Sequence, residues 1–247
     1  MNPYLAELIG TALLILFGNG VVANVVLART KGHGSGWIVI TAGWGLAVFI
    51  GAFCSAQFSG AHLNPAVTLA MAMAGKLEAA KVAGYLAAQM AGAITGAVLV
   101  FCFYREHFKA TDDPEAKRAC FCTAPNIRNH AQSFFCEVVG TFCLILPVFL
   151  MTDASLKFAE PAQTAEVGLG SLGLVPVALV VFAIGLSLGG TTGYAINPAR
   201  DLGPRIAHAL LPVPGKGDSD WGYAWVPVVG PLVGAALAVG VQMLLTR

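Results

Sequence analysis

The chain has 247 residues, of which 57% are hydrophobic and 11% are charged, and its formal net charge is +1. Soluble domains carry about 25% charged residues, so this composition cannot cover a globular surface with polar groups. It indicates an integral, multi-pass protein embedded in a lipid bilayer, and a net charge this close to zero offers no electrostatic means of binding nucleic acid.

Stretches that lack Asp, Glu, Lys and Arg mark the expected membrane crossings, each of which needs about 20 apolar residues. These stretches are 8–28, 32–75, 82–104, 138–152, 167–199 and 221–246. The second is too long for one helix and too short for two, so we expect a span over 37–57 and a half-helix over 64–75. The fourth becomes a full span when 129–137 is added. The fifth is interpreted as a span ending near Gly189 and a half-helix over 197–209.

Each expected half-helix begins with the same tripeptide, Asn64-Pro65-Ala66 in one and Asn197-Pro198-Ala199 in the other. Asn is a favoured helix cap, and Pro fits the first helical position because no N–H is needed there. Non-helical backbone at membrane depth is tolerated only inside protein or around a cavity. The sequence therefore predicts an all-α membrane protein with six transmembrane helices and two re-entrant half-helices.

The two halves repeat, which predicts one channel domain over 1–247. The first repeat is 1–103, the connecting loop is 104–131 and the second repeat is 132–247. Glu7 and Glu137 occupy equivalent positions in these repeats, as do Gly92 and Gly234. Because each repeat has three spans, the second must insert upside down, and such inverted repeats place their site at the midplane.

Backbone groups before each tripeptide are the expected pore lining. Carbonyls of Gly60, Ala61, His62 and Leu63 on one side, and of Gly193, Ala195 and Ile196 on the other, would accept hydrogen bonds from a desolvated solute. The Asn64 and Asn197 amides would donate at the centre, although a purely capping role is the alternative. Glu7 and Glu137 are expected to accept hydrogen bonds from the N–H groups of the re-entrant loops. His62 is interpreted either as orienting its loop or as a packed core histidine.

The segments around both tripeptides, 59–68 and 193–201, resemble the two signature loops of the aquaporins. Asp201, with Arg205 four residues later, is similar to the aquaglyceroporin or glycerol-facilitator branch. The resemblance covers the whole chain. It implies a passive channel for glycerol, water and other small neutral solutes such as urea, assembled as a homotetramer in the plasma membrane.

By the same resemblance, Trp44, Gly185, Tyr194 and Arg200 form the selectivity filter. Trp44 and Tyr194 would make an apolar wedge, and Gly185 would leave space for Tyr194, where His would favour a water-selective channel. Asp201 and Arg205 would support the second loop. The resemblance places both termini in the cytoplasm, whereas the count of Lys and Arg, ten after odd-numbered spans against four elsewhere, predicts the reverse by the positive-inside rule. We follow the resemblance.

Three other functions remain as alternatives. A water-selective aquaporin is argued against by Gly185 and Asp201, and a coupled transporter would need titratable groups at the centre. A hydrolase would use Gly185-Leu186-Ser187-Leu188-Gly189 as a Gly-x-Ser-x-Gly elbow, but that motif needs a strand-to-helix turn and a paired base. We expect no enzyme activity, cofactor or metal site. Cys120 and Cys122 are expected to be free thiols.

Overall fold

The computed structural model of the chain describes residues 2–152, 154–157 and 164–246. Within these residues, six helical segments are long and apolar enough to cross a membrane. They are α1 (Pro3–Val26), α2 (Trp37–Ser59), α4 (Ala79–Phe103), α7 (His130–Leu150), α8 (Val175–Ser187, preceded by the 3-10 helix η1, Gly170–Leu174) and α10 (Val226–Leu245). The all-α, six-span architecture predicted from the sequence is therefore confirmed.

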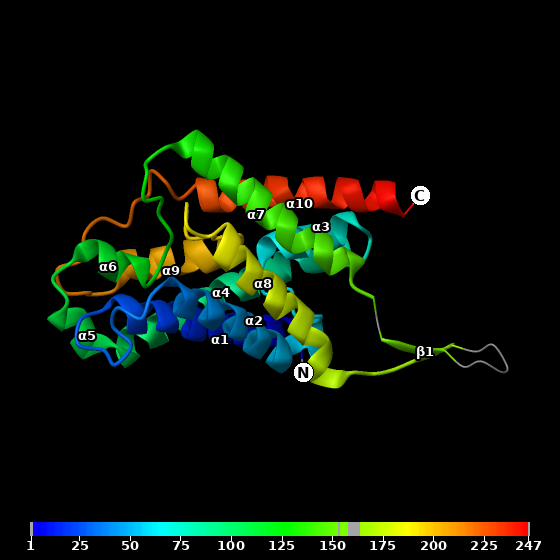
Figure 1. Cartoon of the computed structure of the whole chain (residues 1–247), viewed down its shortest axis with the longest axis horizontal. Coiled ribbons are helices and arrows are strands. Elements are labelled where there is room, and N and C mark those ends of the chain that lie inside the picture. The colour runs from blue at the N-terminus through cyan, green and yellow to red at the C-terminus, as the bar shows by residue number, and fades with distance from the viewer. Residues whose placement is uncertain (1, 153, 158–163, 247) are drawn as a thin grey trace.

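Two short helices, α3 (Pro65–Met73) and α9 (Pro198–Leu210), have lengths of 9 and 13 residues. At 1.5 Å per residue they are about 14 and 20 Å long, too short for a hydrocarbon core of about 30 Å. In Figure 1, α3 lies toward the right of the helical body and α9 toward the left. The chain therefore enters the body from opposite ends to form them.

Glycines make the packing of the two halves equivalent. A Cβ atom at Gly92 of α4 would lie 2.3 Å from the Leu8 carbonyl oxygen of α1, and one at Gly234 of α10 would lie 2.3 Å from the Val138 carbonyl oxygen of α7. Only a residue without Cβ allows backbones to approach this closely, which is how membrane helices associate without a hydrophobic driving force. The matching distances are what an inverted repeat would produce.

The connection after α4 is more ordered than the loop that the sequence predicts. It contains α5 (Arg105–Ala110) and α6 (Pro114–Ala119), which Figure 1 shows at the opposite end from the C-terminus. The Asp113 side chain caps α6, and Pro114 occupies its first position. Phe108 is fully buried, so the segment packs against the helical body instead of crossing it as a free loop.

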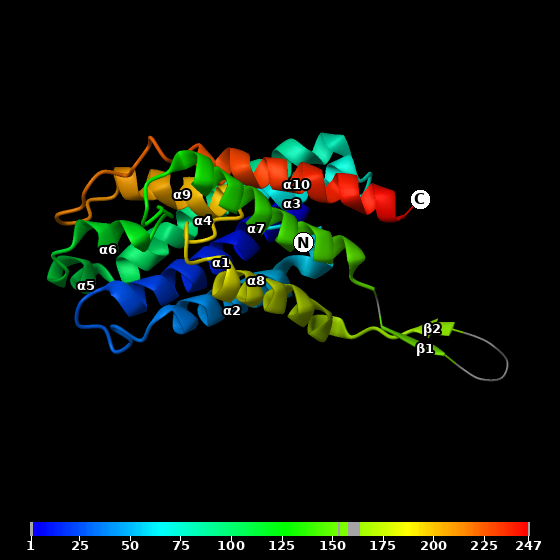
Figure 2. The ribbon, with the colours of Figure 1, turned by 45° about the horizontal axis from the view of Figure 1, so that its top comes forward.

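The connection between α7 and α8 contains a two-stranded antiparallel hairpin, β1 (Ser155–Lys157) and β2 (Thr164–Glu166). Figure 2 shows it projecting from the helical body at the same end as the C-terminus. Asp153, residues 158–163 and Arg247 lie outside the described residues.

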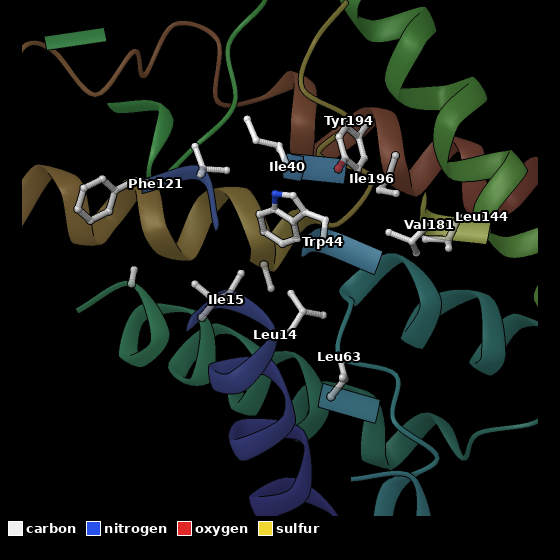
Figure 3. Close-up of a cluster of buried hydrophobic side chains, with 14 of the residues drawn as sticks. Leu14, Ile15, Ile40, Trp44, Leu63, Phe121, Leu144, Val181, Tyr194 and Ile196 are labelled. Carbon is white, nitrogen blue, oxygen red and sulfur yellow. The ribbon is translucent and has the colours of Figure 1, made fainter. Parts of the chain in front are cut away.

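A hydrophobic cluster fills the space between the spans and surrounds the half-helix tips (Figure 3). Leu14 and Ile15 of α1, Trp44 of α2 and Leu144 of α7 are each less than 9% exposed. Leu63 and Ile196, the residues before the two asparagines, belong to the same cluster, as do Ile40, Val181, Phe121 and Tyr194. The tips of both half-helices therefore end in the core of the molecule.

Candidate functional site

The tips of the two half-helices meet through their first residues. The Asn64 side-chain oxygen accepts the Ala66 N–H at 2.8 Å, and that of Asn197 accepts the Ala199 N–H at 3.0 Å, so each caps its own helix. Each amide nitrogen then donates across to the other loop, from Asn64 to the Ile196 carbonyl at 2.9 Å and from Asn197 to the Leu63 carbonyl at 2.8 Å. An amide has two N–H groups, so one remains on each asparagine for a solute.

The loops before the tips adopt matching, strained backbones. Ala61 and Leu63 have φ values of 52° and 51°, and Tyr194 and Ile196 have 38° and 43°. Non-glycine residues rarely occupy this left-handed region, and each costs of order 1–3 kcal/mol unless surrounding contacts enforce it. Strain at matching positions of both loops indicates that surrounding contacts hold each loop in one particular conformation.

Two buried carboxylates supply contacts that enforce this conformation. Glu7 accepts the His62 and Leu63 N–H groups at 2.9 and 2.7 Å, and Glu137 accepts those of Ala195 and Ile196 at 3.0 and 2.8 Å. Both side chains are fully buried. With these N–H groups bonded to a carboxylate, the carbonyls of His62 and Ala195 can face a cavity, whereas those of Leu63 and Ile196 accept the asparagine amides.

A cavity of about 150 Å³ lies beside the tips, and a second of about 290 Å³ lies outside it. The central cavity is lined by Asn64, Asn197 and the expected carbonyl residues Gly60, Ala61, His62, Leu63, Ala195 and Ile196, whereas Gly193 lines the outer cavity. Apolar side chains such as Leu14, Val48 and Val181 complete the central cavity. The volume of one water is about 30 Å³, so the central cavity has room for a short file of water molecules or one small polyol.

Trp44, Tyr194 and Arg200 line both cavities and therefore mark the place where they meet. The Arg200 guanidinium carbon lies 4.0 Å from the centre of the Trp44 ring, a cation–π arrangement. The resemblance implied that Trp44 and Tyr194 make an apolar wedge. In the structure the guanidinium covers one face of the indole, which leaves less of Trp44 for carbon atoms than expected.

Gly185 lines neither cavity, because Tyr194 covers it. A Cβ at Gly185 would lie 2.9 Å from both Cζ and the hydroxyl oxygen of Tyr194. The position thus acts by making room for the tyrosine ring, and the Trp44, Tyr194 and Arg200 side chains are the ones that the structure brings together at the junction.

Asp201 and Arg205 of α9 form a fully buried ion pair, with 2.8 Å between Arg205 Nη2 and Asp201 Oδ1. Asp201 also accepts the Thr123 N–H and hydroxyl at 2.8 and 2.7 Å, and Arg205 donates to the carbonyls of Thr123, Ser219 and Asp220. The pair therefore fastens α9 to the connection before α7 and to the segment before α10.

His62 and the two loop cysteines have separate surroundings. His62 lines the central cavity, its Nδ1 lies 3.2 Å from the Thr68 hydroxyl, and its ring lies 5.0 Å from that of Tyr85. Cys120 and Cys122 are buried in the part of the chain that the structure describes, and neither is in a disulfide there. Burial raises the pKa of the Cys122 thiol to about 12 and raises that of Cys120, so both thiols stay protonated at neutral pH.

Sequence reasoning missed Asn19 and Phe121. The Asn19 side-chain oxygen and the Phe121 carbonyl each lie 3.5 Å from Arg200 Nη1, and the Asn19 amide donates to the same Phe121 carbonyl at 3.2 Å. Asn19 is fully buried in α1. An Asn inside an apolar span was the available signal, because an intramembrane amide needs a partner.

Comparison with known proteins agrees with this geometry. The family described as Major intrinsic protein matches residues 1–241. A probable glycerol uptake facilitator protein of Thermotoga maritima is 52% identical over 96% of both chains, and a glycerol uptake facilitator protein of Streptococcus pneumoniae is 50% identical over 97% of both. The X-ray structure of the aquaglyceroporin from Plasmodium falciparum has a TM-score of 0.79 and 32% identity, covering 96% of this chain and 93% of its own.

The family match spans nearly all of the described helices, and relatives of about 50% identity cover the same length. The similarity therefore extends over almost the whole chain and is not confined to the two tripeptide segments. This chain belongs to the major intrinsic protein family.

Proposed function

We propose that the protein is a passive transmembrane channel for glycerol and other small neutral solutes, that it also conducts water, and that it excludes ions and protons. The observation that carries this proposal is the junction of the two cavities at Trp44, Tyr194 and Arg200, which line the central cavity together with the two asparagine tips. The names of the relatives from Thermotoga maritima and Streptococcus pneumoniae support glycerol as a solute.

The central cavity has a polar strip and an apolar wall, which suit a small polyol. Each solute hydroxyl that loses water without a replacement partner would cost about 1–3 kcal/mol. Loop carbonyls accept from these hydroxyls, and the free N–H of Asn64 and Asn197 donates to them at the centre. Leu14, Val48 and Val181 face the carbon backbone. A solute can thus exchange its hydration for protein contacts along the whole path.

Ions meet a different environment. The N-termini of α3 and α9 both lie at the tips, and each helix N-terminus carries roughly half a positive charge. Arg200 adds a full charge at the junction of the cavities. Cations and hydronium are repelled there, and any ion must also lose hydration that this partly apolar path does not replace.

Membrane placement and assembly are part of the same proposal. By resemblance to the aquaglyceroporins, we propose a homotetramer in the plasma membrane, with both termini in the cytoplasm and α5 and α6 outside. A water-selective channel is the less favoured function, because Gly185 lets the Tyr194 ring lie back against α8 and leaves room for carbon atoms.

Stopped-flow light scattering on proteoliposomes tests this proposal by comparing water, glycerol and urea. We expect glycerol permeability well above that of protein-free vesicles. Gly185→His should reduce glycerol flux about tenfold or more while water flux persists, because the imidazole would push Tyr194 toward the path. Glycerol permeability equal to that of protein-free vesicles, with water flux raised, would instead identify a water-selective channel.

A further inference from the structure

Tyr194 lies in a seat made by two glycines four residues apart, Gly185 in α8 and Gly189 just beyond the end of that helix. A Cβ atom at Gly189 would lie 2.4 Å from Tyr194 Cδ1, and one at Gly185 would lie 2.9 Å from Tyr194 Cζ. The two glycines thus receive different parts of the same ring, Gly189 the near edge and Gly185 the hydroxyl end. This is a structural reason for the Gly185-Leu186-Ser187-Leu188-Gly189 motif, whose resemblance to a hydrolase elbow the sequence left without a role.

Trp37 forms the third wall of the seat. Its ring meets that of Tyr194 edge to face, with 5.9 Å between centroids and an interplanar angle of 79°. The Trp37 indole N–H donates to the Gly185 carbonyl at 2.9 Å, which fixes the indole against α8. A Cβ at Gly189 would also meet Trp37 Cζ2 at 2.9 Å, so the two aromatic rings and Gly189 share one small space.

In the described part of the chain, no hydrogen bond of its hydroxyl holds the tyrosine ring there. The Tyr194 hydroxyl has no hydrogen-bond partner among the described residues, although the residue is only 6% exposed. The main chain adds to the constraint, because Tyr194 has a φ of 38° and the preceding Gly193 N–H is bonded to the Gly189 carbonyl at 2.9 Å. The ring cannot move toward α8, and the direction left open is toward the junction of the two cavities.

We propose that Gly189, with Trp37 as its partner wall, is a specificity-determining position, because it sets how far the Tyr194 ring stands back from the solute path. This inference rests on the proposed channel function and adds to the filter two residues, Gly189 and Trp37, that line the outer cavity. A side chain at residue 189 would displace the ring toward Trp44 and Arg200. Carbon atoms begin ordinary contact near 3.5 Å, so even one methyl group requires a shift of about 1 Å.

Gly189→Ala in proteoliposomes tests the seat. We expect glycerol permeability to fall about tenfold, the effect of one misplaced methyl group in a tight site, while water permeability falls far less. Gly240→Ala in α10 is the control, because Gly240 is exposed, lines neither cavity, and a Cβ there meets nothing within 4 Å. It should leave both permeabilities unchanged. An unchanged ratio of glycerol to water permeability in Gly189→Ala would overturn the proposal.

The double variant Gly189→Ala/Tyr194→Ala separates the seat from simple backbone crowding, since a Cβ at Gly189 would also lie 2.7 Å from the Gly185 carbonyl oxygen. If the methyl group acts through the ring, removing the ring should restore glycerol permeability to at least the unsubstituted level. Failure to restore it would assign the effect to the backbone and overturn the proposal.

A structure of the Gly189→Ala variant distinguishes this inference from the channel function itself. The seat predicts that the Tyr194 ring moves by about 1 Å toward Trp44, whatever solute the protein conducts. An unmoved ring would overturn the seat even in a glycerol-conducting protein. A moved ring in a protein whose unsubstituted form does not pass glycerol would support the seat and refute the proposed solute.

Discussion

Arg200 carries a buried charge at the junction of the two cavities, and its neighbours arrange it without neutralising it. The Trp44 ring lies under the guanidinium, while Asn19 and the Phe121 carbonyl lie beside it. None of these three groups is an anion. The positive charge therefore acts on whatever passes, and its remaining donors are available to solute hydroxyls.

Arg200→Val should raise proton permeability severalfold while glycerol flux persists, because it removes the full positive charge from the junction. A pH-sensitive dye trapped in proteoliposomes measures the leak. Lys31→Val is the matched control, since it removes an exposed charge on the same side of the membrane. A proton leak equal in the two variants would show that Arg200 does not provide the electrostatic barrier.

Asp201→Asn should lower the free energy of unfolding by about 3–5 kcal/mol, because it leaves Arg205 as an unpaired charge in a fully buried site. Titration with a denaturing detergent, followed by circular dichroism, measures the loss. Glu78→Gln is the control, because Glu78 forms an exposed salt bridge with Lys81. The Glu78 and Lys81 side chains are 73% and 43% exposed, and such pairs contribute at most about 1 kcal/mol. Equal losses would mean that the buried pair has no special role.

At the scale of single elements, each re-entrant loop depends on one carboxylate from a neighbouring span. Glu137 of α7 accepts two loop N–H groups and the Thr192 hydroxyl, and Glu7 of α1 does the same with Ser59. A hydrogen bond to an ionised group contributes about 1.5–3 kcal/mol, enough to offset the strain of a left-handed residue. Each re-entrant loop therefore contains left-handed residues and has one carboxylate whose hydrogen bonds offset the cost of their conformation.

Glu137→Gln should reduce stability by about 2 kcal/mol and lower the folding yield, because an amide can accept one of the two loop N–H groups but not both. Permeability per folded channel should change much less. Purified yield, detergent unfolding and stopped-flow flux normalised to folded protein check this, with the exposed Glu115→Gln as control. Flux that falls while stability stays constant would place Glu137 in conduction instead.

The half-helices could be predicted because Asn-Pro at membrane depth has few structural explanations. The hydrogen bond from each asparagine to the opposite loop could not be predicted, because no local sequence pattern indicates which carbonyl will face Asn64 or Asn197. Likewise, Asp201 and Arg205 are a recognisable i,i+4 pair, but their complete burial depends on Thr123, far away in sequence. Helix caps and membrane spans could be predicted because they depend on neighbouring residues. Contacts between distant segments could not, because they depend on how the whole chain folds.

At the scale of the whole molecule, the excess of basic residues after odd-numbered spans is partly structural. Arg205 and Lys117 are buried, Arg200 lies at the cavity junction, and the Lys216 ammonium donates to the carbonyls of His208, Ala209 and Leu211 at the end of α9. Charges fixed inside the fold are unavailable to interact with the membrane surface. Without these four residues the count is six against four, so burial reduces the excess of basic residues that disagrees with the proposed orientation but does not reverse it.

A salt bridge between Arg128 and Asp220 joins the end of the connecting loop to the segment before α10, with two hydrogen bonds of 2.9 and 2.7 Å. Burial alone would raise the pKa of the Asp220 carboxyl, but the hydrogen bond and charge of Arg128 outweigh it, so the pKa lies below its usual value. A carboxyl with a lowered pKa stabilises the folded state above its unfolded pKa, near 3.9, and this contribution is lost as pH falls through the folded pKa.

Asp220→Asn should therefore be less stable than the unsubstituted protein at pH 7, and the difference should shrink as pH falls below about 4. Arg128 is half exposed, so solvent screening limits the difference to about 1 kcal/mol or less. Asn tolerates the φ of 54° at this position, and the substitution keeps the backbone carbonyl that Arg205 uses. Thermal unfolding in detergent from pH 3 to 7 measures the effect, with the exposed Asp112→Asn as control. A difference that is the same at pH 3 and pH 7 would show that ionisation of Asp220 does not hold the two segments together.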